Sequence, residues 1–216
     1  MIPSAVLNVL SLICNLAVVV FMLKALITFF TVGGSGNMKV KKTSAFVYFT
    51  VQSNLFMGAA ALIMLVFNVI LLFDPGVTVP YWVVLVNFVM TVAVMLTFCV
   101  VMFVFVPVTG LHEMIEGDNI FLHAISPILA LVTFVFFEYY ARLRPTAFLW
   151  ALLPVVVYGI VYYVMVIIVG EEKGGWKDFY GFNKNGKWAF SALMILVMTL
   201  VIAAAVYFGH NCIACG

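Results

Sequence analysis

Six long runs of apolar residues constrain this chain more than any other feature. They cover residues 5–31, 43–73, 79–106, 120–140, 146–170 and 187–208, and charged residues are nearly absent from them. About 20 apolar residues in a helix span the hydrocarbon of a bilayer, and in lipid only helices or closed barrels satisfy the backbone. Runs this long and continuous favour helices. The sequence therefore predicts an all-α polytopic membrane protein, a single domain over residues 1–216 formed by one bundle of six transmembrane helices.

The composition supports a lipid environment. Of the 216 residues, 67% are hydrophobic and 8% are charged, whereas about a quarter of the residues of a soluble domain are charged. No basic patch interleaved with exposed aromatic residues is evident, so nucleic acid is not an expected partner. The expected partners are the bilayer and a lipid, and the sequence leaves the oligomeric state open.

The orientation of the bundle follows from where the basic residues fall, because short cytoplasmic loops carry an excess of lysine and arginine. The only basic residues in the even-numbered loops are Arg142 and Arg144. This asymmetry predicts that the odd-numbered loops are cytoplasmic and that both termini are extracytoplasmic. The lysines of the odd-numbered loops are Lys39, Lys41, Lys42, Lys173, Lys177 and Lys184, with Lys187 at the edge.

The most unusual polar stretch lies near the start of the second apolar run, where the sequence reads Tyr-Phe-Thr-Val-Gln-Ser-Asn over residues 48–54. Thr50, Ser53 and Asn54 share one face of a helix, while Gln52 points elsewhere. Polar groups inside a bilayer need partners or serve a function. This face is therefore a candidate site.

A second polar spot, His123 with Ser126, lies at the start of the fourth run. Counted from the expected helix starts, Thr50 lies about 10 Å deep and His123 about 6 Å deep, at a rise of 1.5 Å per residue. Both helices start at the same membrane face, so the two side chains can meet if the helices are neighbours. A threonine hydroxyl becomes a nucleophile when a base such as neutral imidazole takes its proton.

The supporting residues of such a site are less well defined. Acyl transfer needs hydrogen-bond donors at the developing oxyanion; Asn54, Gln52 and Ser53 are the candidates. Asn87 and Thr91 share a face of the third helix and are expected to line the same pocket. The groups that can orient the imidazole are Asn119, Glu116 and Ser126, and His112 in an acidic connector is a reserve base.

Structural interpretations compete with each functional one. Serine, threonine and amide side chains commonly join membrane helices to one another. Tyr158 and Tyr162 favour packing or interface anchoring, and Glu138 is expected to form an interfacial pair with Arg142, which leaves the bundle without a buried ionisable chain. The tail, with Cys212, Cys215 and His210, falls short of the four ligands of structural zinc, so no metal is expected.

At the polar residues the chain resembles the androgen-induced-protein family, which includes the androgen-dependent TFPI-regulating protein and a branch of bacterial six-pass membrane proteins. The resemblance rests on Tyr48–Asn54 and on Asn-Ile-Phe-Leu-His-Ala-Ile-Ser-Pro, residues 119–127. It implies a threonine hydrolase that cleaves fatty-acid esters of hydroxy fatty acids, with Thr50 and His123 as the catalytic pair. The last loop, Asp178–Phe182, lacks the proline of the family pattern, which bears on substrate identity because this loop is expected to cover the pocket mouth.

These observations predict an intramembrane hydrolase of lipid acyl esters that uses a threonine nucleophile and a histidine base and needs no cofactor. Two other functions fit the same sequence. One is a small transporter or channel, which requires a continuous polar path through the membrane. The other is a non-catalytic lipid-binding membrane protein in which the polar face only binds partners.

Overall fold

The computed structural model describes residues 4–31, 33 and 42–214, and within them every regular element is a helix. Five helical stretches are long and apolar enough to cross a membrane, and a sixth, Phe121–Phe137, is apolar but shorter. The all-helical prediction is confirmed. The long stretches are Ala5–Thr31, Phe49–Phe73, Tyr81–Thr109, Ala147–Val169 and Trp188–Ile213.

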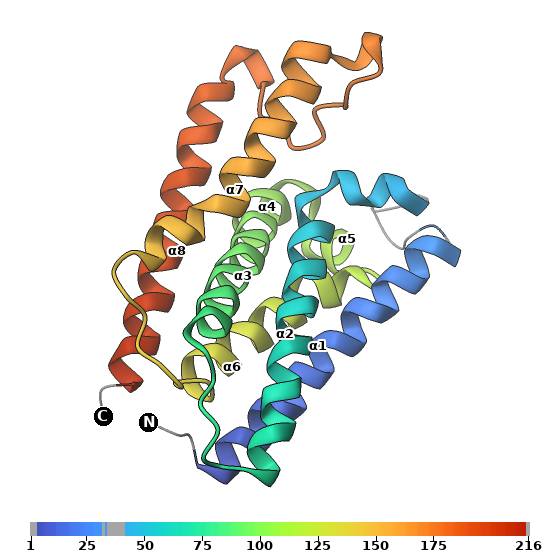
Figure 1. Cartoon of the computed structure of the whole chain (residues 1–216). Coiled ribbons are helices and arrows are strands. Elements are labelled where there is room, and N and C mark those ends of the chain that lie inside the picture. Colours follow the sequence, from blue (N-terminus) through green and yellow to red (C-terminus); the bar gives the residue numbers. More distant parts are fainter. Residues whose placement is uncertain (1–3, 32, 34–41, 215–216) are drawn as a thin grey trace.

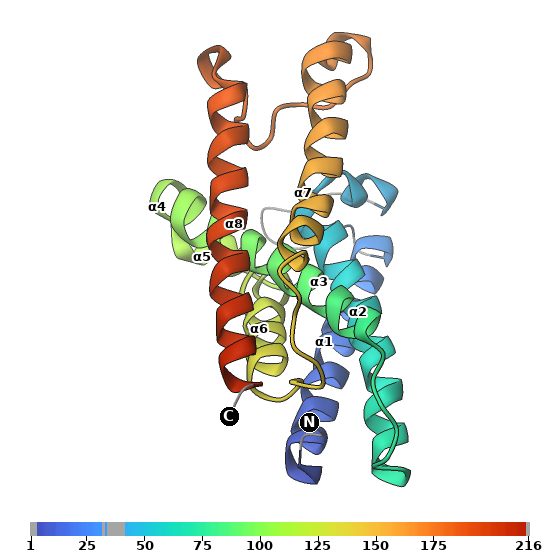
Figure 2. The ribbon, with the colours of Figure 1, turned by 60° about the vertical axis from the view of Figure 1, so that its left-hand side comes forward.

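Helix α3 (Tyr81–Val100) occupies the centre of the bundle (Figures 1 and 2). It packs against α2 (Phe49–Phe73), α6 (Ser126–Phe136), α7 (Ala147–Tyr163) and α8 (Trp188–Ile213), while α1 (Ala5–Thr31) packs against α2 and α6. The start of α1 and the end of α8 lie at the same end of the bundle (Figure 1).

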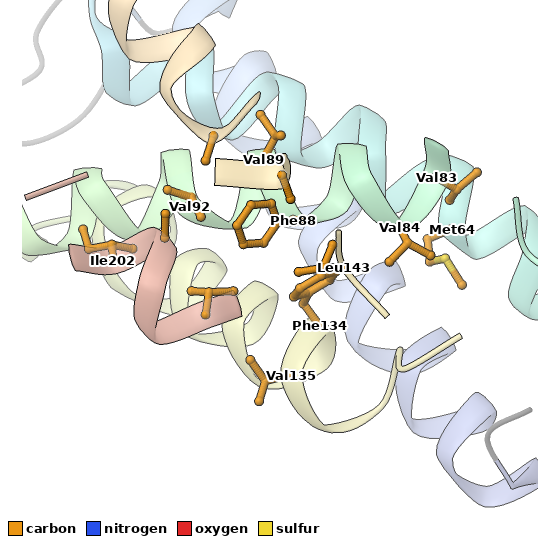
Figure 3. Close-up of a cluster of buried hydrophobic side chains, with 14 of the residues drawn as sticks. Met64, Val83, Val84, Phe88, Val89, Val92, Phe134, Val135, Leu143 and Ile202 are labelled. Carbon is orange, nitrogen blue, oxygen red and sulfur yellow. The ribbon is translucent and has the colours of Figure 1, made fainter. Parts of the chain in front are cut away.

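The packed core surrounds α3 and takes side chains from α2, α6, α7 and α8 (Figure 3). The rings of Phe88 and Phe134 meet at its centre, with ring centroids 6.1 Å apart, and both are almost completely buried. The outer face is apolar as well: Phe103 is 71% exposed and Leu149 is 70% exposed. Large apolar side chains on the outside and inside alike suit a helix bundle surrounded by lipid.

Three helical stretches contain a turn of π-helix, and prolines explain two of them. The π-turns are η2 (Val101–Phe105), η3 (Phe121–Ile125) and η4 (Val164–Val169). Pro107 follows η2 and Pro127 follows η3; proline has no backbone N–H and cannot close an ordinary helical hydrogen bond. Such turns are frequent at functional sites.

Two predicted helix boundaries were wrong. The second predicted helix, 43–73, is divided: Lys42–Val47 forms the 3-10 segment η1, and α2 begins at Phe49. Thr50 therefore lies in the first turn of α2 rather than two turns into it. The fourth predicted helix, 120–140, ends near Phe137, and Glu138 lies in the turn beyond α6.

The connector from Gly170 to Lys187 folds back against the bundle. It contains the short 3-10 segments η5 (Glu171–Lys173) and η6 (Lys184–Gly186). Between them the Tyr180 hydroxyl accepts a hydrogen bond from the Phe49 backbone N–H, 3.0 Å away. The connector is thereby attached to the first residue of α2. The remaining short helices are α4 (Val106–Thr109) and α5 (Leu111–Ile115).

Candidate functional site

An apolar cavity of about 410 Å³ lies between α3, α7, η4 and α8. This volume is within the range of about 300–1,000 Å³ found for small-molecule sites. The walls are mostly aliphatic and aromatic, and Tyr180 and Phe182 of the last connector contribute to them. The cavity also reaches Phe49 and Thr50 at the start of α2. Thr50 thus lies at a chamber whose walls suit an acyl chain.

A tyrosine hydroxyl lies beside Thr50. Tyr180 accepts from the N–H of Phe49, and the hydroxyls of Tyr158 and Thr50 lie close to the same phenol. Burial raises the pKa of Tyr180 to about 12. At neutral pH the phenol is therefore uncharged, so it can donate a proton in a hydrogen bond but does not act as a base.

The connector that carries Tyr180 is held in place by one carboxylate. Asp178 accepts hydrogen bonds from the Tyr162 hydroxyl at 2.8 Å and from the backbone N–H groups of Phe182 and Asn183 at 2.9 and 2.8 Å. The Tyr162 hydroxyl in turn accepts from the Tyr180 N–H at 3.2 Å. Tyr162 and Tyr158, expected to serve packing, thus line the cavity as well as fixing its cover.

His123 lies in the π-turn η3, buried, and close to the backbone of α5. Its Nδ1 is 2.6 Å from the carbonyl oxygen of Met114. A carbonyl oxygen only accepts, so Nδ1 carries the proton and Nε2 is the basic nitrogen of the neutral ring. The group that orients the ring is therefore this carbonyl. In the described part of the chain, none of the three side chains considered for that role (Asn119, Glu116 and Ser126) is hydrogen-bonded to the imidazole.

The structure brings the helices of Thr50 and His123 together but does not join the two side chains. In the residues described, no hydrogen bond links Thr50 to His123, and His123 is not among the residues that line the cavity. The link between the two helices is Asn54. Its Nδ2 donates to the carbonyl oxygens of Thr50 at 2.8 Å and of Leu122 at 3.0 Å.

The Asn54 bond to Leu122 has a clear physical cause. In η3 the N–H of Ser126 donates to the carbonyl of Phe121. The next bond in this π-pattern would run from residue 127 to Leu122, but Pro127 has no N–H. The Leu122 carbonyl is left without a backbone donor, and Asn54 supplies one from the neighbouring helix.

The other predicted oxyanion donors are also engaged. Gln52 Nε2 donates to the carbonyl of Phe46 at 2.6 Å. Ser53 Oγ donates to the carbonyl of Thr50 at 3.2 Å and lies 3.1 Å from the Thr97 hydroxyl. The amide of Asn54 uses both of its hydrogens on backbone carbonyls. These contacts give all three residues a role in joining helices.

The remaining predicted site residues lie away from the cavity. Asn87 contacts a different polar centre, around Glu138, and Thr91 lies one turn further along the same face of α3; neither residue lines the cavity. Asn119 and Ser126 are buried near His123, and the Asn119 Nδ2 has no hydrogen-bond partner. His112 and Glu116 are exposed at the bundle surface.

The prediction for Glu138 was wrong. The residue is 3% exposed, and it forms no ion pair with Arg142; among the described residues the ion pair seen is Lys24 with Asp118, at 3.0 Å. The Glu138 carboxylate instead accepts from Ser11 Oγ at 2.8 Å, Asn15 Nδ2 at 2.6 Å and Asn87 Nδ2 at 3.2 Å. The bundle does contain a buried ionisable group, contrary to expectation.

A sequence signal for this centre existed but was missed. Asn8, Ser11 and Asn15 recur at a spacing of three and four residues along the first apolar run, which places them on one helical face. Asn68 in the second run is similarly isolated among apolar residues. This spacing does not indicate which of these side chains contact one another in the folded bundle.

The described residues contain no group of three or more histidine, cysteine or acidic side chains placed to hold a metal ion. Cys215 of the predicted tail motif and Lys39 and Lys41 of the first loop lie outside the described residues. Both ring nitrogens of His210 already face carbonyl oxygens, Phe134 at 3.0 Å and Ala141 at 2.9 Å.

The cavity therefore has the Thr50 hydroxyl and the neutral Tyr180 phenol at one end, while the His123 imidazole lies on the adjoining helix, outside the lining of the cavity. No family model, no curated protein and no solved structure matches this chain. Membership of the family that residues 48–54 and 119–127 resemble therefore remains a prediction.

Proposed function

We propose that this chain is an intramembrane hydrolase of lipid acyl esters, such as fatty-acid esters of hydroxy fatty acids, with Thr50 as the nucleophile. The observation that carries the proposal is the position of Thr50 at an apolar cavity of about 410 Å³, next to the Tyr180 phenol. The apolar walls can accommodate an acyl chain. The ester carbonyl would then lie where the cavity meets α2, next to the few polar groups of its lining.

In the proposed reaction the Thr50 oxygen forms a bond to the ester carbonyl carbon while His123 Nε2 takes the hydroxyl proton. The tetrahedral intermediate then releases the alcohol, which receives that proton from His123. Water, deprotonated by the same nitrogen, attacks the acyl-threonine carbonyl. The bond to the Thr50 oxygen then breaks, His123 returns the proton to that oxygen, and the fatty acid is released. Splitting the reaction through a covalent intermediate replaces one difficult step with two easier ones.

Tyr180 is the best donor for the oxyanion of this reaction. Its neutral phenol lies by Thr50 and is polarised by the Phe49 N–H, which donates to its oxygen. The first turn of α2 also presents the positive end of its helix dipole there. Asn54, Gln52 and Ser53, whose donors are engaged elsewhere, are better suited to holding the helices.

The proposal requires His123 to reach Thr50 directly or through one water molecule. Catalytic hydrogen bonds are often long in an enzyme without substrate and tighten in the complex. The Nδ1 bond to Met114 favours this role because it leaves Nε2 basic. The polar link through Asn54 keeps η3 beside the start of α2.

The test is turnover of a lipid ester by the purified chain in detergent or nanodiscs. Thr50→Ala is expected to reduce turnover by a factor of 1,000 or more, on the order of the loss seen when a nucleophile is removed, and Thr50→Ser is expected to retain part of it. The matched control is Thr109→Ala, since Thr109 is exposed and bonds only to its own helix. Full turnover in folded Thr50→Ala would overturn the proposal.

The base is tested by a second pair of variants. His123→Ala is expected to lose turnover to a similar degree, and His112→Ala, at the exposed histidine of α5, is expected to keep it. Loss of turnover in His112→Ala alone would assign the base to His112 instead. Folding of each variant is checked by its gel-filtration profile and thermal unfolding.

Non-catalytic lipid binding is the second candidate, and the apolar cavity favours it equally. In that case lipid co-purifies with the parent chain and with Thr50→Ala alike, and no ester is turned over by either. A fluorophosphonate probe separates the two functions, because it labels Thr50 only if the hydroxyl is activated.

A further inference from the structure

The buried carboxylate of Glu138 lies in a second polar centre, remote from the cavity. Glu138 follows α6 at the end of the bundle that holds the start of α1 and the end of α2 (Figure 1). Asn68, five residues before the end of α2, lies about 7.5 Å from that end at 1.5 Å per residue. The centre is therefore near one face of the bundle, whereas Thr50 lies at the start of α2, near the other.

Two helices direct polar side chains at this carboxylate, and a third helix joins the group through them. From α1, Ser11 Oγ and Asn15 Nδ2 approach one oxygen at 2.8 and 2.6 Å, and from α3, Asn87 Nδ2 approaches the other at 3.2 Å. Asn68 of α2 joins the group through Ser11 and Asn15, with its Oδ1 at 3.3 and 3.2 Å from them.

The outer part of the centre adds further oxygens. Asn68 Nδ2 donates to Asn8 Oδ1 at 2.9 Å, and the Tyr140 hydroxyl lies 3.2 Å from the same nitrogen. The Tyr140 hydroxyl donates to Asn8 Oδ1 at 3.3 Å. Tyr140 is the titratable group that faces the centre from the described residues.

No cationic side chain balances Glu138. In the described part of the chain no lysine, arginine or histidine forms an ion pair with it, and His210 faces the carbonyls of Phe134 and Ala141 instead. Hydroxyls and amides stabilise a carboxylate but leave its charge in place. A buried charge is expensive unless it is paired or coordinated.

Two buried oxygens in the same region have no partner. Asn87 Oδ1 belongs to the amide that contacts Glu138, and Thr91 Oγ1 lies one turn further along α3; both residues are at most 2% exposed. Buried polar atoms without partners are rare and call for an explanation. A carbonyl oxygen can only accept, so the missing partner of Asn87 is electropositive.

We propose that this centre binds one monovalent cation of about the size of sodium, coordinated by Glu138 together with oxygens of Ser11, Asn68, Asn87 and Thr91. Hard cations prefer oxygen ligands. A single carboxylate among neutral oxygens balances one positive charge, whereas calcium sites commonly gather several carboxylates. Rotation of the Asn87 amide turns its unpartnered oxygen toward the carboxylate and the ion.

Such an ion would join α1, α2, α3 and the turn after α6 at one point, so its binding must stabilise the folded bundle. The inference is independent of lipid hydrolysis, since none of these residues lines the cavity. The competing occupant is a proton on Glu138, which would also remove the buried charge.

The test is thermal unfolding of the full-length purified chain at fixed pH, with NaCl exchanged for choline chloride at constant ionic strength. Sodium is expected to raise the midpoint in a saturable way by roughly 5 °C or more, as a ligand well above its dissociation constant does. Potassium is expected to be less effective. Binding of radioactive sodium measures the same site directly.

Glu138→Gln is expected to abolish both the rise in the unfolding midpoint and the binding of radioactive sodium. Thr91→Val keeps the shape of the side chain but removes one oxygen, and it is expected to weaken sodium binding at least tenfold. Thr91→Val also serves if Glu138→Gln does not fold. The control is Glu171→Gln, an exposed carboxylate in the last connector, which is expected to respond as the parent does. Equal midpoints in sodium and choline, a sodium response retained in Glu138→Gln, or stability that follows pH alone would overturn the proposal.

Discussion

Tyr180 illustrates how a single side chain from a connector completes a site built by helices. Its hydroxyl reaches the first turn of α2, where the Phe49 N–H has no partner within the helix. The phenol oxygen satisfies that donor, and the same hydroxyl lies beside the side chain of Thr50. One residue thus anchors the cover of the cavity and adds polarity where the ester is proposed to bind.

Tyr180 also gives the chain a defined response to alkali. Its pKa is about 12 in the folded protein, above the ordinary value of 10.0, because burial disfavours the charged phenolate. The resulting stabilisation is fully present below pH 10 and is lost as the pH rises from 10 through 12. We expect the parent chain to lose more stability over this interval than Tyr180→Phe does. Chemical unfolding at the two pH values measures this, with tyrosinate absorbance as the direct titration; equal losses in both chains would contradict it.

At the level of elements, the contact between α2 and η3 depends on the side-chain amide of Asn54 and on the backbone N–H that Pro127 lacks. Pro127 leaves the Leu122 carbonyl without a backbone partner, and Asn54 supplies it. We expect Asn54→Leu to destabilise the bundle by about 1–2 kcal/mol, because two buried carbonyl oxygens lose a donor. Ser191→Ala is the control: it removes a partly exposed hydroxyl that bonds only to the carbonyl of Lys187, the N-cap of its own helix, and is expected to cost less than about 0.5 kcal/mol.

A double-mutant cycle tests the cause as well as the size of this effect. Pro127→Ala restores an N–H at position 127, so the Leu122 carbonyl can regain a helical partner. Asn54→Leu is then expected to cost less in the Pro127→Ala background than in the parent. Strictly additive losses, measured by reversible unfolding in mixed detergent, would mean that Asn54 acts through some other contact.

The helices themselves were largely predictable, because a long apolar run can be recognised as a helix from its own length and composition, without knowing what it packs against. The exceptions depend on contacts between residues far apart in the sequence. Prediction extended the fourth helix to residue 140, but the chain turns after Phe137, and Glu138 folds inward to the amides of α1. The bond from Asn15 to Glu138 joins residues 123 positions apart. Spacing along one helix cannot name so distant a partner.

The candidate site was predictable in part for the same reason. The polar face of Thr50, Ser53 and Asn54 was visible in the sequence, and so was His123 on another helix. Tyr180 was not, since only folding brings the last connector to the start of α2. The group that orients His123 is a backbone carbonyl, that of Met114, and no side-chain pattern reports it.

At the scale of the whole molecule, the two polar centres lie toward opposite ends of the bundle. The stretch Phe121–Phe137 connects these levels, but at 1.5 Å per residue it spans only about 25 Å, less than the roughly 30 Å of hydrocarbon. The exposed Glu116 precedes it and the exposed Arg142 follows it. Whether this short helix spans the membrane decides on which side of the membrane every later loop lies.

We expect six crossings, with both termini and Arg142 outside. In a chain freed of its native cysteines, Asp74→Cys and Arg142→Cys should react with an impermeant thiol reagent on intact cells. Glu116→Cys and Glu172→Cys should react only after permeabilisation. The lysines of the first and fifth loops are expected to retain those loops in the cytoplasm, and the third loop, which has no basic residue, then lies on the same side. If Arg142→Cys behaves like Glu116→Cys, the stretch Phe121–Phe137 does not cross and the bundle has five spans. If all four positions react in the reverse pattern, six crossings stand but the orientation is inverted, and water would then reach Thr50 from outside the cell.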